Sequence, residues 1–239
     1  MALPILNSSR YETRIPSTGK QIEFRPFLVK EEKILMVAME SKDSKLMMKA
    51  LKDVLKACIY DDIDVDKLTS FDLEEIFLRL RSKSVGEKVQ LNLGCSECGA
   101  KTPVELNLDN IGVTNMPEDR HVMLTDSIGV SFNYPSVDLV TELEVSGAKE
   151  MTPEQQVELT YKMIVSCIDN IFSDEEVWDA ENQTEKELQE FMDGLNSQQF
   201  AKVTDFFGNL PALEHEVEYN CISCGANNST ELRGLSSFF

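Results

Sequence analysis

Two short stretches of the same form, CSECG at Cys95–Gly99 and CISCG at Cys221–Gly225, guide the interpretation of this sequence. In each stretch two cysteines are separated by two residues and followed by a glycine, which permits a tight turn. Alternating apolar residues flank both stretches, a pattern that is typical of β-strands. We therefore expect each C-x-x-C-G stretch, called a knuckle below, to lie at the tip of a β-hairpin.

The two knuckles together supply four thiolates, which is the closed ligand set of a structural zinc ribbon. The predicted ligands of one zinc ion per chain are Cys95, Cys98, Cys221 and Cys224. Closing the loop between the knuckles costs about 4 kcal/mol, whereas a structural zinc site contributes roughly 10–16 kcal/mol. Two independent redox pairs, or four unligated thiols, are the alternatives. Cys58 and Cys167 each lie on an apolar helix face and are predicted to be core residues.

Composition and charge argue against a membrane protein, a secreted protein and a nucleic-acid-binding protein. No apolar run approaches the ~20 residues of a membrane span, and the start, MALPILNSSR, lacks the basic region and long apolar stretch of a secretory signal. We therefore expect a reducing compartment, where paired cysteines are more often metal ligands than disulfides. The formal net charge of -19 disfavours binding to nucleic acid.

The hydrophobic periodicity changes from that of helices to that of strands and back, which predicts an α+β fold. The three predicted parts are an N-terminal arm with helices (residues 1–86), a small antiparallel β unit that carries the split four-cysteine zinc ribbon (87–134 with 211–239), and a helical insert between the two knuckles (135–210). Within the insert, residues 152–172 are expected to form one helix, with Thr152 as its cap and Pro153 in its first turn.

Three segments carry expectations about contacts. Thr13–Phe27 contains Pro26 in an alternating stretch, so we interpret it as an edge strand or extended arm that contributes to an interface. A basic stripe recurs at helical spacing and either docks an acidic partner or is a solvated helix face. This stripe consists of Lys45, Lys49, Lys52 and Lys56. The terminal Phe238 and Phe239 either fill the protein's own core beside the ribbon or anchor in a partner.

The sequence offers no catalytic constellation. A catalytic zinc keeps one position open for water, whereas here four cysteines fill the shell. The sequence contains no Walker loop, no GxGxxG and no HExxH, and its two histidines are His121 and His215. We expect no catalytic residues and no organic cofactor, although a nitrogen ligand from His215 would reopen the case for a more reactive metal.

Two longer stretches resemble a known family. IPSTGKQIEFRPFLVKEEKILMVAMES (Ile15–Ser41) and FDLEEIFLRLRSKSVGEKVQL (Phe71–Leu91), followed by a C-x-x-C-G, resemble the baseplate proteins of T4-like contractile-tailed bacteriophages, in particular their hub subunit and tail assembly proteins. The likeness is strongest over residues 13–100 and continues more loosely to the second knuckle. No catalytic residues are transferred from the family, and the zinc assignment rests on the cysteines of this sequence.

The resemblance implies a non-enzymatic structural component of a phage tail baseplate hub, or of its assembly. Its expected location is the virion tail baseplate, and the host cytoplasm during assembly. The implied partners are other baseplate hub or tail proteins, with the tape-measure protein as a candidate, and neither nucleic acid nor membrane. Two alternatives remain: a zinc-ribbon regulator that binds a polymerase, and an assembly chaperone that is absent from the mature virion.

Overall fold

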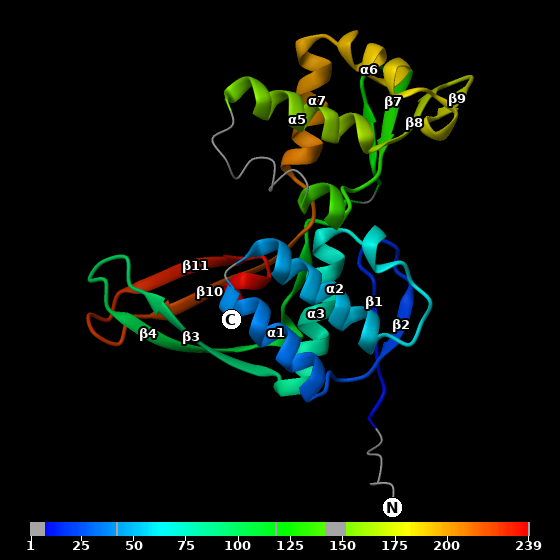
Figure 1. Ribbon diagram of the computed structural model, residues 1–239. Coiled ribbons are helices and arrows are strands. Elements are labelled where there is room, and N and C mark those ends of the chain that lie inside the picture. Colours follow the sequence, from blue (N-terminus) through cyan, green and yellow to red (C-terminus); the bar gives the residue numbers. More distant parts are fainter. Residues whose placement is uncertain (1–7, 42, 118, 142–151, 239) are drawn as a thin grey trace, which may run out of the picture. The chain divides into compact units, whose positions relative to one another are not determined.

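The computed structural model of the chain describes residues 8–41, 43–117, 119–141 and 152–238. The chain divides into two compact units. Unit 1 consists of Met1–Thr114 and Ala212–Phe239, and unit 2 is Asn115–Pro211 (Figure 1). Helices and small antiparallel sheets occur in both units, which confirms the α+β class. None of the helices in the described ranges is long and apolar enough to cross a membrane.

Three helices form the N-terminal part of unit 1: α1 (Val29–Ser41), α2 (Ser44–Cys58) and α3 (Ser70–Val85). The Asp43 carboxylate caps α2 by accepting bonds from two backbone N–H groups, and α3 opens with a capping box. In that box the Thr69 hydroxyl accepts from the Asp72 N–H while the Asp72 carboxylate accepts from the Thr69 N–H. These local bonds satisfy the first N–H groups of each helix.

The basic stripe of α2 is used partly within unit 1. Lys52 and Lys56 both contact the carboxylate of Asp66, at 3.3 and 2.7 Å, and the Lys52 side chain is buried. Lys45 and Lys49 are exposed. Half of the stripe therefore fixes the loop that follows α2, so the stripe as a whole is not a free docking surface.

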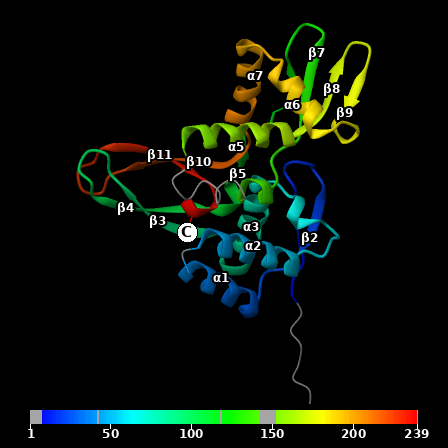
Figure 2. The ribbon, with the colours of Figure 1, turned by 45° about the horizontal axis from the view of Figure 1, so that its top comes forward.

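In the described part of unit 1 the strands form three antiparallel sheets. The sheets are β1 (Tyr11–Arg14) with β2 (Gln21–Phe24), β3 (Lys88–Gly94) with β4 (Lys101–Asn107), and β5 (Gly112–Thr114) with β10 (Ala212–Asn220) and β11 (Asn227–Arg233). The hairpins β3–β4 and β10–β11 run side by side, with their knuckles at the same end (Figures 1 and 2). Short 3-10 turns η1 (Val65–Lys67), η2 (Leu108–Asn110) and η4 (Leu235–Phe238) complete the unit.

Helix α3 ties these elements together through its polar residues. Arg79 donates from Nη1 to the Leu108 carbonyl at 2.8 Å and from both Nε and Nη2 to Glu75 Oε1. A further bond joins Arg79 to the Ile111 carbonyl, and Glu75 accepts from the Val113 N–H at 3.1 Å. Both side chains are largely buried, so this pair fixes the chain between β4 and β5 against α3.

The two hairpins share one core with α3 and the C-terminus. Phe238 is fully buried in it, beside residues of β4, η2 and both strands of the second hairpin. Of the two alternatives for the terminal aromatics, Phe238 therefore takes the first and fills the protein's own core, and Phe239 lies outside the described residues.

The segment Thr13–Phe27 contains an edge strand, which is one of the two expected forms, and is not an extended arm. β1 and β2 form a hairpin whose Ile15, Ile22 and Phe24 are at most 4% exposed. The Ser17 N–H and hydroxyl both donate to the Asp72 carboxylate on α3, at 2.8 and 2.6 Å. The apolar residues of the alternation therefore face the core of unit 1, and the segment is part of the unit's own packing.

Unit 2 contains a four-stranded antiparallel sheet in the order β6 (His121–Met123), β7 (Ile128–Phe132), β8 (Ile168–Ser173), β9 (Val177–Asp179). Its helices include α5 (Pro153–Ser166), α6 (Glu185–Asp193) and α7 (Ser197–Gly208), residues 137–141 are also helical, and a 3-10 turn, η3, spans Ala180–Asn182. Residues from one face of the sheet, among them Val130 and Ile171, pack with residues of the three helices in a separate core.

The predicted division of the chain needs correction at this point. The insert begins at Asn115, not at residue 135, and it is not purely helical, because β6 and β7 pair with strands inside the insert and not with the knuckle hairpins. The predicted helix 152–172 ends at Ser166, and Ile168–Ser173 is strand β8. Its capping by Thr152 is confirmed. The apolar run continues the helical spacing, but pairing with β7 and β9 decides its conformation.

Candidate metal centre

The two knuckles have the same backbone geometry. In each, the N–H of the glycine donates to the carbonyl of the first cysteine, and the N–H of that cysteine donates to the carbonyl of the residue after the glycine, all at 2.9 Å. Gly99 and Gly225 have φ angles of 70° and 75°, a region that favours glycine over other residues. The strand pairing ends at the same place in both hairpins, at Gly94–Lys101 and Asn220–Asn227. The glycines therefore allow two superposable turns.

The tips bring four sulfur atoms together. Cys95 Sγ lies 3.7 Å from Cys224 Sγ, and Cys98 Sγ lies 3.6 Å from Cys221 Sγ. All four sulfurs are within 4.8 Å of one another. A disulfide requires about 2.05 Å, whereas sulfurs bound tetrahedrally at about 2.3 Å from a zinc ion are about 3.8 Å apart. The donor set and its spacing therefore fit one tetrahedral metal ion shared by the two hairpins.

Each knuckle is held by a polar residue from the other hairpin. The Asn228 side-chain carbonyl accepts from the Ser96 N–H at 2.9 Å, and its amide lies 3.6 Å from Cys95 Sγ. In the reciprocal position, the Thr102 hydroxyl accepts from the Ile222 N–H at 3.3 Å. Thr102 and Asn228 are both buried. Each follows the first cysteine of its own knuckle by seven residues, so the two contacts are related by an approximate twofold symmetry.

This symmetry extends the repeat beyond the knuckles. The burial pattern along β4 is the same as that along β11. Leu106 and Leu232 occupy equivalent buried positions, each preceded by a glutamate. Sequence reasoning recognised the C-x-x-C-G frames and missed this longer repeat, including Thr102 and Asn228. Their common offset from the cysteines is the signal that was available.

Backbone N–H groups favour the thiolate form of the buried cysteines. The N–H groups of Cys224 and Ser223 lower the pKa of the Cys221 thiol to about 6, and the N–H of Cys98 lowers the pKa of Cys95. At Cys224 the Ala226 N–H also lowers the pKa, but the neighbouring thiols, Cys98 first, raise it more, to about 12. Four thiolates at this spacing repel one another, so a cation is needed for all of them to ionise.

The other cysteines and histidines lie elsewhere. Cys58 and Cys167 are buried, and burial raises the pKa of each thiol to about 11, so both are inert core residues as predicted. His215 pairs across the hairpin with Leu232, six residues before the second knuckle. Among the described residues, the group that could hold a metal ion consists of the four cysteines and does not include His215.

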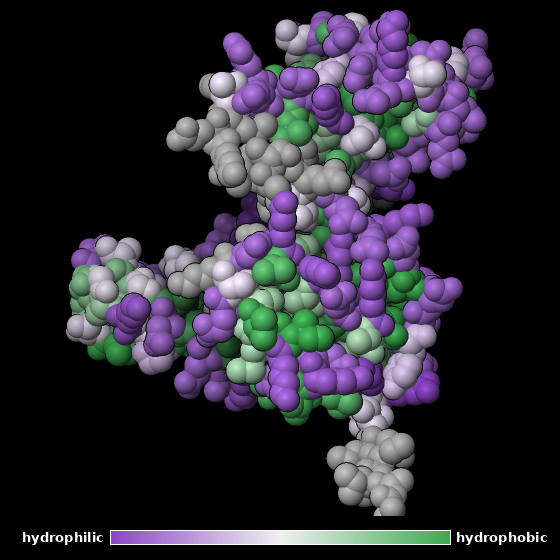
Figure 3. Space-filling view, viewed as in Figure 1, coloured by the Kyte–Doolittle hydropathy of each residue, from purple (hydrophilic) through white to green (hydrophobic). Residues whose placement is uncertain are grey.

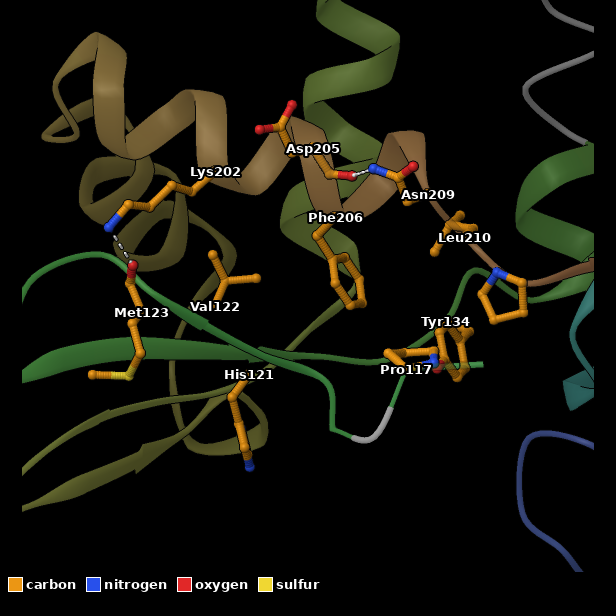
Figure 4. Close-up of a pocket in the computed structure, with 11 residues that line it drawn as sticks. Pro117, His121, Val122, Met123, Tyr134, Lys202, Asp205, Phe206, Asn209 and Leu210 are labelled. Atoms are coloured by element: carbon orange, nitrogen blue, oxygen red, sulfur yellow. Dashed lines mark hydrogen bonds between the residues drawn. The ribbon is translucent and has the colours of Figure 1, made fainter. Parts of the chain in front are cut away.

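Unit 2 contains a pocket of about 350 Å³. It lies between β6 and α7, and apolar residues such as Val122 and Phe206 contribute to its lining (Figure 4). The Lys202 ammonium donates to the Met123 carbonyl at 2.8 Å, and the Asn209 amide donates to the Asp205 carbonyl at 2.8 Å. His121 points away from these groups (Figure 4). The Lys202 bond links α7 to β6 at the edge of the sheet, and the Asn209 bond lies at the C-terminal end of α7 itself.

Comparison with known proteins gives a consistent assignment. The family model described as T4 bacteriophage base plate protein matches residues 8–239. The baseplate hub assembly protein gp26 of Enterobacteria phage T4 is 26% identical over 230 residues, which cover 96% of this chain and 97% of that protein. No solved structure matches the chain.

Proposed function

The chain belongs to the family of T4 bacteriophage base plate proteins, and from this membership we propose that it is a non-enzymatic component of the tail baseplate hub or of its assembly. We further propose that one structural zinc ion, held by the four knuckle cysteines, joins its two hairpins. The observation that carries the second part is the convergence of four sulfurs, from knuckles separated by 122 residues, at the spacing of a tetrahedral site.

The proposed role of the zinc ion is to fix the far ends of the two hairpins. At their base the hairpins share a core with α3, but at their tips Cys98 and Cys224 are exposed, so little apolar burial holds the knuckles there. A bound Zn²⁺ would neutralise the thiolates and hold both turns in one rigid tip. Thr102 and Asn228 orient the turns, and the buried Cys95 and Cys221 direct their sulfurs inward.

A rigid paired tip suits a protein that assembles with others. The proposed partners are other baseplate or tail proteins, because the names of both the family and the T4 relative refer to the baseplate. The name of that relative, a hub assembly protein, favours a second candidate: an assembly factor that is not retained in the mature virion.

One experiment tests the proposed function and separates its two forms. A phage that lacks this chain is complemented with the wild-type protein or with Cys221→Ser, and tail assembly and infectivity are measured. We expect the wild type to restore tails and Cys221→Ser to fail, with Cys58→Ser as the matched control. Peptides of the chain in purified tails would identify a structural component, and their absence an assembly factor. Normal tails without this chain would contradict both.

A further inference from the structure

Helix α1 exposes more apolar surface than the packing of unit 1 explains. The residues that it buries are Glu31, Leu35 and Ala38, which form one narrow stripe against the unit. On the opposite side Val29, Met36 and Val37 are between 59 and 73% exposed. Figure 3 shows apolar side chains gathered over this part of unit 1. Surfaces of this kind on soluble proteins commonly mark an interface.

The charges on the exposed side of α1 are arranged symmetrically. Lys33 and Glu40 are both exposed, and they lie on either side of the apolar pair Met36–Val37 at equal distances along the helix. At 100° per residue, Lys33 and Glu40 fall within about 20° of each other, close to the centre of the face opposite the buried stripe. Met36 and Val37 lie about 50° to either side of that centre.

This pattern is complementary to itself when the helix is reversed. If a second α1 is placed antiparallel across this face, with a twofold axis between Met36 and Val37, Lys33 of each copy lies opposite Glu40 of the other. Met36 of each copy then lies opposite Met36 of the other, and Val37 opposite Val37, because the twofold axis keeps each flank of the helix on its own side. A twofold interface requires that one surface match itself in this way, and two opposite-charge contacts with two apolar contacts satisfy the requirement.

We propose that α1 is a self-association surface, on which a second copy of this chain docks its own α1 in antiparallel orientation. The apolar residues supply most of the free energy of association, and the two Lys33–Glu40 contacts fix direction and register. α1 is about 20 Å long, which is short for an interface of roughly 800 Å² per partner. The dimer is therefore weak and depends on protein concentration.

The test is the oligomeric state of the full chain by sedimentation equilibrium at low salt, up to about 300 µM, a range that detects weak dimers. We expect the wild type to dimerise. Lys33→Glu, or Glu40→Lys alone, should raise the dissociation constant about tenfold, because each places two like-charge contacts in the dimer. The double variant with both substitutions should return to within about threefold of the wild type.

Recovery of dimerisation in the double variant would distinguish a direct Lys33–Glu40 contact from a general effect of charge or folding. Lys186→Glu is the matched control, because it makes the same change of net charge at an exposed lysine of unit 2. It should leave the dissociation constant unchanged, and Val37→Glu should abolish the dimer without lowering the melting temperature. A wild type that stays monomeric at the highest concentration, or a double variant as weak as the single ones, would overturn the proposal.

Discussion

At the scale of residues, two side chains beside the four cysteines link the knuckles to each other. Thr102 and Asn228 each accept a backbone N–H from the opposite knuckle, so each hairpin carries the group that positions the other. Tyr219 adds a third link, from its hydroxyl to the Gly94 carbonyl at 2.5 Å. For the proposed zinc ion, contacts that already hold the sulfurs close together would reduce the ordering cost of binding.

The first prediction concerns the ligands. Purified wild-type protein should contain one zinc ion per chain with sulfur-only ligation, and Cys221→Ser should contain almost none, because three thiolates leave an open shell. Elemental analysis and X-ray absorption measure both. Cys58→Ser and Cys167→Ser are the controls and should keep the metal, since both thiols are buried away from the knuckles. Two ions per chain, no zinc, or a nitrogen ligand would each contradict the four-cysteine centre.

The second prediction concerns the supporting shell. Asn228→Leu removes the acceptor for the Ser96 N–H and the amide next to Cys95 Sγ, while it keeps a similar volume. We expect zinc affinity to fall about 10–100-fold, the usual range for such partners of a ligand. Competition with a chromogenic chelator measures it. The adjacent Asn227 is exposed, so Asn227→Leu is the control. Equal affinities for the two variants would show that Asn228 does not support the centre.

At the scale of elements, interactions between residues close in sequence determine where the helices begin, whereas pairing with distant segments determines the strands. The caps at Thr69 and Thr152 were predictable, because the bonds that make a cap lie within a few residues. Strand β8 was not predictable in this way, since Ile168–Ser173 continues the apolar spacing of α5 and becomes a strand only through β7 and β9. The contacts of Thr102 and Asn228 also depend on how the hairpins pack. Each residue follows its first cysteine by seven positions, but the contact that it makes is seen only when the two hairpins lie side by side.

The third prediction tests α3 as the element that joins the others. Arg79→Gln removes the pair with Glu75 and the bonds to the Leu108 and Ile111 carbonyls, and leaves a largely buried carboxylate without its cation. We expect the free energy of unfolding of unit 1 to fall by about 2–4 kcal/mol. Urea denaturation measures it.

Lys83→Gln is the control for this change. Lys83 also bridges α3 to the following segment, through Glu87 and Asp109, but on a more exposed side of the helix. Exposed ion pairs contribute about 0–1 kcal/mol, so its loss should be small. If both substitutions cost the same, the buried pair would not be what fixes β4 and β5 to α3.

At the scale of the whole chain, unit 2 is an insertion whose two connections are neighbours. Thr114 is the last residue of unit 1 before the insert, and Ala212 is the first residue after it. These two residues are directly paired across β5 and β10. The insert is therefore closed at its base by strand pairing, so loss of zinc should loosen the knuckles without releasing unit 2. Unit 2 also carries most of the net negative charge, with 5 Lys and Arg against 20 Asp and Glu, compared with 18 against 22 in unit 1.

The fourth prediction follows from this closure. Replacing Asn115–Pro211 by Asn-Gly joins two paired antiparallel residues through a two-residue turn, which is the loop that such hairpins favour. We expect the shortened chain to fold and to bind one zinc ion, because the core of the hairpins and α3 contains no residue of the insert.

The isolated insert, residues 115–211, should also unfold cooperatively, because its core is separate. Circular dichroism melting and elemental analysis measure both. A shortened chain that folds only when the insert is restored would show that unit 1 depends on unit 2.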